Sequence, residues 1–178
     1  MEYISSDTNI WIDFATIQKL HLPFLLPYTY IMSTDAIDDE LLSPPTLRDD
    51  LLRCGLVGVD ITIEEFELAE QYGGKYRKLS VYDRIALAIA KNRSIVLLTG
   101  DMALRRAATA EGVSILGTLG IVDRLYDVAF ISKAEYKECL DAFTRFNGHG
   151  IRLPQDEINI RLHKLTKEVV NKDEYGRS

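Results

Sequence analysis

Residues 80–101, which read SVYDRIALAIAKNRSIVLLTGD, decide the fold of this chain. The first half places apolar residues at helical spacing behind Ser80, a residue type that caps helices, and it predicts a buried helix over 80–90. The second half is a run of β-branched and aliphatic residues, typical of a strand buried on both faces of a parallel sheet. This helix and strand carry an acid at each end of the unit, Asp83 and Asp101.

Strand and helix patterns alternate along most of the chain. We predict strands at 3–7, 28–32, 55–61, 95–98 and 113–116. We predict helices at 8–19, 33–42, 46–53, 62–72, 80–90, 102–111 and 119–130, the fourth of which ends at Gly73-Gly74. This order predicts an α/β protein with three layers, α/β/α, around a central, mostly parallel sheet.

Two more helices, at 132–147 and 154–169, follow this alternation. We therefore divide the chain into a domain at 1–130, a helical extension at 131–170 and a polar tail at 171–178 that we expect to be disordered. The extension can serve dimerisation, contact with a partner protein, or the core alone. We favour packing against the core, because amphipathic helices are usually stabilised by burial.

The composition is that of an ordinary globular protein, with 178 residues, 47% of them hydrophobic, and a net charge of -6. No segment reaches the roughly 20 apolar residues that a membrane span needs, so we expect a cytoplasmic protein that does not enter a membrane. Cys54 and Cys139 lie far apart, which favours two buried thiols over a disulfide or a zinc site. The three histidines, His21, His149 and His163, have no partner at ligand spacing.

Four acids are expected at one edge of the sheet: Asp7, Glu40, Asp83 and Asp101. Asp7 lies where the first predicted strand meets the next helix, and Asp101 lies shortly after the fourth strand, at the strand ends where open parallel sheets bind ligands. The helices that carry the other two acids can reach the same edge. Taken singly, each acid has a simpler explanation as a helix cap, a charge near a helix dipole or a solvated side chain. The run Asp38-Asp39-Glu40 also leaves open which acid is the second member.

Taken together, the four acids indicate a metal site. Carboxylates within about 4 to 6 Å of one another repel and raise one another's pKa, and divalent cations relieve that repulsion. Oxygen ligands select Mg²⁺ or Mn²⁺. Such a site suits the hydrolysis of phosphodiester bonds, which needs neither a histidine nor a serine nucleophile. The number of ions stays open.

Basic residues could bring phosphates to this site. Lys75, Arg77 and Lys78 form the densest basic cluster, directly before the central helix, and are either a solvated loop or a phosphate-contacting one. Arg84 and Arg105 are further candidates for phosphate contacts. The net charge argues against a broad electropositive surface, but metal ions can supply local positive charge in an acidic protein.

These residues resemble the spaced motifs of the PIN domain family over about residues 1–130. The motifs are Ser6-Asp7-Thr8-Asn9, Glu40-Leu41, Asp83 followed by Ile85-Ala86-Leu87-Ala88, and Leu98-Thr99-Gly100-Asp101 with Leu104. The sequence departs from some members of the family at Ala103, where they carry a further acid.

The resemblance implies a ribonuclease dependent on Mg²⁺ or Mn²⁺, in which Asp7, Glu40, Asp83 and Asp101 bind metal and act in catalysis. It also implies polar supporting roles for Asn9 and Thr99. Many small prokaryotic members are toxins that a partner antitoxin neutralises, and many form homodimers. The resemblance therefore implies an RNA substrate and makes an antitoxin and a second copy of the chain possible partners.

Two alternatives remain at this point. A PIN-like module can keep these acids and bind RNA or a protein without cutting. A phosphatase of the haloacid dehalogenase type also begins with an Asp after its first strand, but it needs a second Asp two residues later, where this chain has Asn9.

Overall fold

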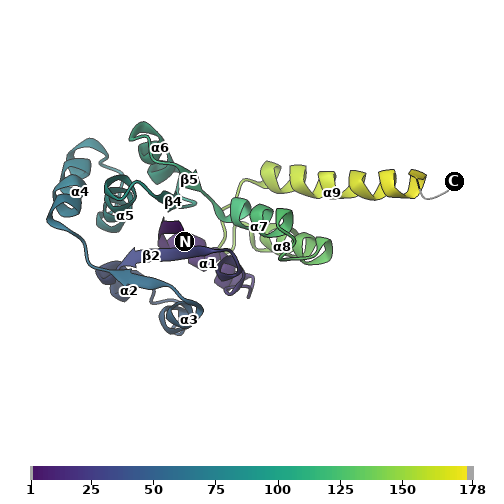
Figure 1. The fold of residues 1–178 in the computed structure, drawn as a ribbon, viewed down its shortest axis with the longest axis horizontal. Helices are drawn as coiled ribbons and strands as arrows, with labels where there is room; N and C mark the ends of the chain where they lie inside the picture. The colour runs from purple at the N-terminus through teal and green to yellow at the C-terminus, as the bar shows by residue number, and fades with distance from the viewer. Residues whose placement is uncertain (1, 176–178) are drawn as a thin grey trace.

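Five parallel strands form one sheet at the centre of the computed structural model, which describes the backbone of residues 2–175 and the side chains of residues 2–167 (Figure 1). Their order across the sheet is β3-β2-β1-β4-β5. The strands are β1 (Glu2–Ser6), β2 (Tyr28–Ser33), β3 (Val57–Val59), β4 (Val96–Leu98) and β5 (Ile115–Leu116). This confirms the predicted parallel sheet.

Helices cover both faces of the sheet. They are α1 (Thr8–Thr16), the 3-10 helix η1 (Leu22–Leu25), α2 (Thr34–Glu40), α3 (Leu47–Cys54), α4 (Ile63–Lys75), α5 (Val81–Asn92), α6 (Met102–Ala110), α7 (Thr118–Asp127), α8 (Lys133–Phe146) and α9 (Gln155–Tyr175). Alternate residues of the strands point to opposite faces. Ile31 and Leu97 belong to one core with α4, α5 and α6, whereas Tyr30 and Leu98 belong to a second core with α1, α2, α3, α7, α8 and α9. The three-layer prediction is confirmed.

Polar side chains cap the first turns of three helices that precede the candidate site in the chain or carry part of it. The Ser33 side chain accepts a hydrogen bond from the backbone N–H of Ala36 at the start of α2. Thr62 and Ser80 each form a capping box, with Glu65 and Asp83 respectively. The start of α5, the central helix predicted from the sequence, is therefore fixed by the pair Ser80 and Asp83.

The predicted end of α4 at Gly73-Gly74 is wrong, because the helix continues to Lys75. A Cβ atom on Gly73 would lie 2.0 Å from Nη1 of Arg84. The glycine therefore makes room for a guanidinium group that lies against the helix. In the sequence, two adjacent glycines indicate the end of a helix. In the structure, Gly73 lies inside the helix, at the place where Arg84 of α5 comes close.

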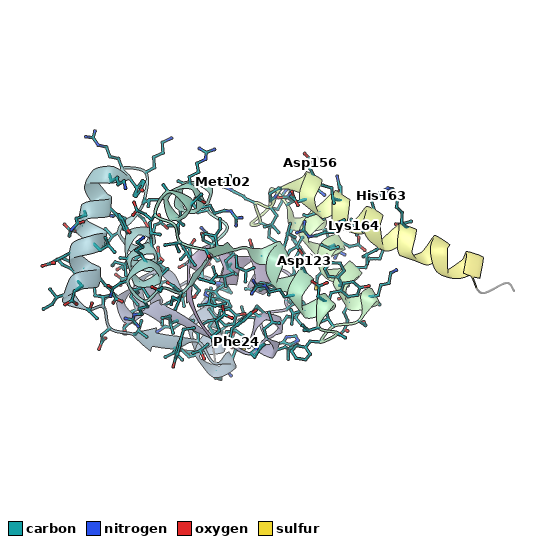
Figure 2. The ribbon with its side chains drawn as sticks, turned by 45° about the horizontal axis from the view of Figure 1, so that its top comes forward. Phe24, Met102, Asp123, Asp156, His163 and Lys164 are labelled. Carbon is teal, nitrogen blue, oxygen red and sulfur yellow. The ribbon has the colours of Figure 1, made fainter. Side chains whose placement is uncertain are left out.

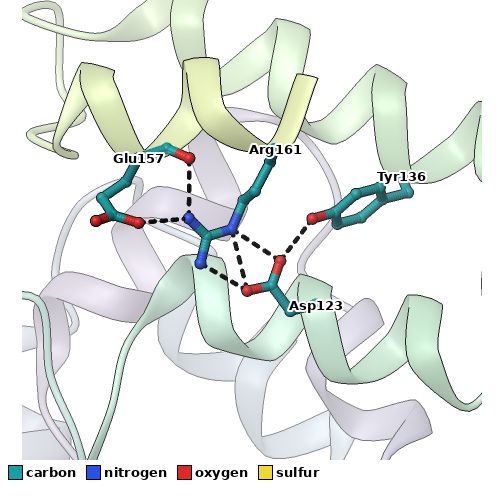
Figure 3. A network of polar contacts seen from close by, with 4 residues as sticks. All are labelled: Asp123, Tyr136, Glu157 and Arg161. Atoms are coloured by element: carbon teal, nitrogen blue, oxygen red, sulfur yellow. Dashed lines mark hydrogen bonds and ion pairs between the residues drawn. The ribbon is translucent and has the colours of Figure 1, made fainter. Parts of the chain in front are cut away.

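The C-terminal helices share the core of the rest of the chain. Phe143 of α8 meets Phe14 of α1 edge to face with ring centroids 6.1 Å apart, and Ile158 of α9 is fully buried in the same core. Arg161 of α9 donates hydrogen bonds to both carboxylate oxygens of Asp123 in α7, at 2.7 to 3.0 Å (Figure 3). The segment expected as an extension is thus packed onto α1 and α7.

Beyond this packed part, α9 projects away from the rest of the molecule (Figure 1). The helix runs through Tyr175, so it includes the first five residues of the tail expected at 171–178. Residues 176–178 lie outside the described residues.

The expectation of two buried thiols is met by one of the two cysteines. Cys139 is buried as expected, but Cys54 is partly exposed at the end of α3, and both are free thiols.

Among residues 2–175, every helix is too short or too polar to cross a membrane.

Candidate active site

The order of the strands puts the candidate site where β1 and β4 lie side by side. The chain passes from β1 to β2 and β3 on one side and then returns to β4 on the other, which is the switch point where open parallel sheets bind ligands. Ser6 is paired with Leu98, and the backbone N–H of Asp7 donates to the carbonyl of Leu98 at 2.9 Å. Asp7 and Thr99 therefore leave the sheet next to each other.

Asp7 is the buried acid of this site, with 6% of its surface exposed. The Thr99 hydroxyl donates to its Oδ2 at 2.9 Å, and Nδ2 of Asn9 donates to the same oxygen at 3.2 Å. Burial and the negative charges of Asp83 and Glu40 raise the pKa of Asp7 to about 7, although the hydrogen bond from Thr99 opposes this rise. Asp7 occupies the cap position of α1 but makes no capping hydrogen bond with its side chain, so capping does not explain it.

Glu40 reaches the site from the last residue of α2. The Thr8 hydroxyl donates to its Oε2 at 2.7 Å, and Glu40 lines one small pocket together with Asp7. Burial raises the pKa of Glu40, as do the charges of Asp83 and Asp39, whereas the hydrogen bond from Thr8 lowers it.

The two acids before Glu40 are bonded to other side chains and do not line this pocket. Asp38 forms an ion pair with Arg48 at 2.9 Å, and Asp39 accepts a hydrogen bond from the Tyr82 hydroxyl. Of the three candidates in this run, Glu40 is therefore the one that shares a pocket with Asp7.

Asp83 lies in the first turn of α5. Its Oδ2 accepts from the backbone N–H of Ser80 at 2.7 Å, while its own N–H donates to the Ser80 hydroxyl at 3.1 Å. Its charge acts on both Asp7 and Glu40. The capping explanation is thus correct for Asp83, and the same residue still contributes negative charge to the site.

Asp101 is joined to Asp7 through Thr99. The Thr99 hydroxyl donates to Asp7 and accepts from the backbone N–H of Asp101 at 3.1 Å. The Oδ1 of Asp101 also accepts from the N–H of Leu104 at 2.7 Å, which caps α6. Asp101 therefore caps a helix and is also linked to Asp7 through a single residue, Thr99.

The donor types of this site fit a hard cation. The hydrogen bonds described above hold one oxygen of each acid, and burial together with the charges of Asp83 and Glu40 raises the pKa of Asp7. Carboxylate oxygens are the ligands that Mg²⁺ and Mn²⁺ prefer. As the side chains stand, the described part of the chain holds no ready group of three or more His, Cys, Asp or Glu at metal-binding positions.

The candidate basic residues are not all near the acids. Lys75 is the last residue of α4 rather than a loop residue, and it forms an ion pair with Glu111 at 2.6 Å, so its contact with phosphate stays a prediction. Arg77 and Lys78 are exposed in the connection to α5. Arg84 donates to the carbonyl of Ser80 at 3.2 Å.

Arg105 is the basic residue tied most directly to the site. Its Nη1 donates to the carbonyl of Thr99 at 3.0 Å. The residue that holds Asp7 therefore also holds this guanidinium group.

Sequence reasoning missed two polar residues. Thr8 holds Glu40, and its signal was its place directly after Asp7. Asp13 is 7% exposed and accepts from the Thr118 hydroxyl at 2.6 Å, and burial raises its pKa to about 6. Its signal was an acid between the apolar residues Ile10 and Phe14 of one helix.

A family model described as PIN domain matches residues 3–167. The matched segment includes α8 and the first part of α9, so these helices are part of the family pattern. Comparison with curated proteins and with solved structures finds no match. The match over most of the chain, together with the parallel sheet and the acids at its switch point, shows that the chain belongs to the PIN domain family.

Proposed function

We propose that this protein is an endoribonuclease that uses Mg²⁺ or Mn²⁺ to hydrolyse RNA phosphodiester bonds. Its family indicates a nuclease-type function in general. The observation that supports the metal is Asp7, a buried carboxylate whose pKa is raised to about 7 by burial and by the charges of two other acids. A buried carboxylate next to like charges costs folding free energy unless a cation is bound. This cost supports a functional role for Asp7 rather than a structural one.

Asp7, Glu40, Asp83 and Asp101 would hold the metal. Bound there, Mg²⁺ or Mn²⁺ supplies a water of lowered pKa and neutralises charge on the phosphate. Thr99 and Asn9 fix one oxygen of Asp7, which leaves the carboxylate in a defined orientation. Thr8 does the same for Glu40. The choice of RNA over DNA rests on the family resemblance.

Cleavage of a mixed pool of tRNA and mRNA tests this proposal. We expect cleavage by the wild type in Mn²⁺, its loss with EDTA, and a loss of at least 100-fold in Asp7→Asn and Asp101→Asn, because each removes a charged ligand. Asp38→Asn is the matched control, since that acid is paired with Arg48 outside the site. Equal cleavage by the wild type, Asp7→Asn and Asp101→Asn would reject the proposal.

We extend the proposal to a cytoplasmic toxin of a toxin–antitoxin pair, with an antitoxin or a second copy of the chain as partner. The support for this step is the resemblance to small prokaryotic PIN proteins. Expression in a bacterial host tests it: the wild type should arrest growth and Asp7→Asn should not. Normal growth with soluble, active wild-type protein would argue against a toxin.

A catalytically silent module that binds RNA or a protein is the second candidate. The observation that favours it is that Asp83 and Asp101 both cap helices, so their carboxylates have a structural use without any metal. Titration calorimetry with Mn²⁺ separates the two. A nuclease site should bind Mn²⁺ in the wild type and lose it in Asp7→Asn, whereas a silent module should bind it weakly and equally in both.

A further inference from the structure

A large cavity reaches the candidate site at Gly100, but none of the four acids lines it, so metal binding does not explain it. Its volume is about 830 Å³, within the range of about 300–1,000 Å³ that is common for ligand sites. One wall comes from α6, β5 and the start of α7, and the other comes from the connection between α8 and α9 and the first two turns of α9. Gly100, which also lines the cavity, directly precedes Asp101.

Figure 2 labels residues on α6 and α9, two helices that contribute lining residues to the cavity. Met102 of α6 and Asp156 of α9 lie on the same side of the molecule, across from each other. Met102 is 57% exposed although it is apolar, and it lines the cavity. The C-terminal segment thus lines the same cavity as α6.

Arg105 lines the cavity and is held by Thr99, the residue that also holds Asp7. Its Nη1 donates to the carbonyl of Thr99 at 3.0 Å, which leaves other N–H groups of the guanidinium for a ligand. A Cβ atom on Gly117 would lie 2.9 Å from this Nη1. Since the φ of Gly117 is -124°, its backbone does not require glycine, and the missing side chain serves to seat the arginine.

Arg152 provides a second cation on the opposite wall. It is exposed, it lines the cavity, and no carboxylate of the described residues pairs with it. Arg161 also lines the cavity, but Asp123 and Glu157 accept its hydrogen bonds, so its charge is already balanced (Figure 3). This network holds α9, and with it the wall that carries Arg152, against α7.

We propose that this cavity binds the single-stranded RNA that enters the candidate active site, with Arg105 and Arg152 contacting its phosphates. The inference rests on the proposed function and gives the C-terminal helices a role in it. Arginine forms strong paired hydrogen bonds with phosphate. The apolar lining of Met102, Ile115, Leu119 and Leu153 offers surface to bases and sugars. An apolar peptide would leave both arginines without a partner, so the charges favour an anionic ligand, and the proposed function supplies RNA as that ligand.

Binding of a fluorescent single-stranded oligoribonucleotide of mixed sequence, followed by anisotropy in EDTA, tests this proposal without cleavage. We expect Arg105→Ala and Arg152→Ala each to weaken binding about 5- to 10-fold. Each should also reduce the slope of log affinity against log salt by about 0.7 for every phosphate that the variant no longer neutralises. Arg106→Ala is the matched control, because this exposed arginine neighbours Arg105 but does not line the cavity.

Gly117→Ala tests the seating of Arg105 without removing any charge. The added methyl group would meet the tip of the arginine and no other atom closer than 3.7 Å, so the melting temperature should change little while RNA affinity falls. Wild-type affinity in the Arg105 and Arg152 variants, or an equal loss in Arg106→Ala, would overturn the proposal.

The result can be separated from the test of catalysis. If the wild type binds RNA through both arginines but cuts none, the nuclease proposal fails and the cavity assignment stands. If the wild type cuts RNA and the arginine variants bind it normally, the cavity assignment fails and the nuclease proposal stands.

Discussion

Asp7→Asn should stabilise the protein in the absence of metal while abolishing its activity. The side chain of Asp7 is 6% exposed, and burial together with the charges of Asp83 and Glu40 raises its pKa from 3.8 to about 7. Ionised Asp7 therefore costs folding free energy. Asparagine keeps an oxygen that can accept from Thr99 and carries no charge.

The size of this effect follows from the pKa. The folded state binds the proton more tightly than the unfolded state, so stability falls as pH rises between about 4 and 7. A shift from 3.8 to about 7 corresponds to roughly 4 kcal/mol at pH 8, at about 1.4 kcal/mol for each pKa unit. At pH 4 the same calculation leaves about half a kcal/mol, because most of the folded protein already holds a neutral Asp7.

Urea unfolding of both proteins in EDTA at pH 4 and pH 8 measures the difference. We expect Asp7→Asn to be more stable at pH 8 by about 2 to 4 kcal/mol, and nearly equal to the wild type at pH 4. Adding Mn²⁺ at pH 8 should stabilise the wild type and not the variant, because only the charged site binds the cation. Asp141→Asn, an exposed acid paired with Lys137, is the control and should change stability by less than about 1 kcal/mol.

The reasoning is wrong if Asp7→Asn is less stable than the wild type at pH 8. That result would mean that the carboxylate is a net stabilising acceptor for Thr99 and Asn9. The repulsion that motivates a metal site would then be absent.

Two further predictions concern residues outside the acid site. Phe143→Ala should destabilise the protein by about 3 to 5 kcal/mol in urea unfolding, because this ring is fully buried in the core shared with α1. Phe130 is 52% exposed, so Phe130→Ala is the control and should cost less than about 1 kcal/mol. Similar costs for both would show that the C-terminal helices are not part of the core. Asp13→Asn should raise the free energy of unfolding by up to about 3 kcal/mol at pH 8 and by little at pH 4. Burial raises the pKa of Asp13 to about 6, so the ionised acid destabilises the folded protein more as pH rises. A gain that does not change between these two pH values in the same unfolding assay would contradict this cause.

The central unit of the fold could be predicted because local and global signals agree there. The apolar residues of 80–90 match a helix face, Ser80 caps it, and the aliphatic run that follows suits a strand covered on both sides. Patterns at the edge of the sheet are weaker. The run 55–61 predicts seven strand residues, but β3 pairs only with β2, and only Val57–Val59 lie opposite residues of that strand.

Errors in the sequence analysis come from contacts between distant segments. Gly73 and Gly74 have the composition of a helix end, and nothing nearby in the sequence indicates that Arg84 lies against Gly73. Lys75 looks like a free loop cation until Glu111, far along the chain, is placed beside it. Contacts of this kind decide whether a charge is available to a ligand, and a local pattern does not contain them.

The acids show why a site can be located from sequence while the role of each member stays open. A carboxylate directly after a strand and before a helix is well placed both to cap the helix and to face a ligand at the edge of the sheet. Asp101 caps its helix by accepting a hydrogen bond from the N–H of Leu104, and its own N–H donates to Thr99, which also holds Asp7. Asp7 has the same place in the chain but makes no cap, and it stands buried beside other negative charges. Because helix capping leaves Asp7 unexplained, this residue, more than the three acids around it, determines whether the site needs a cation.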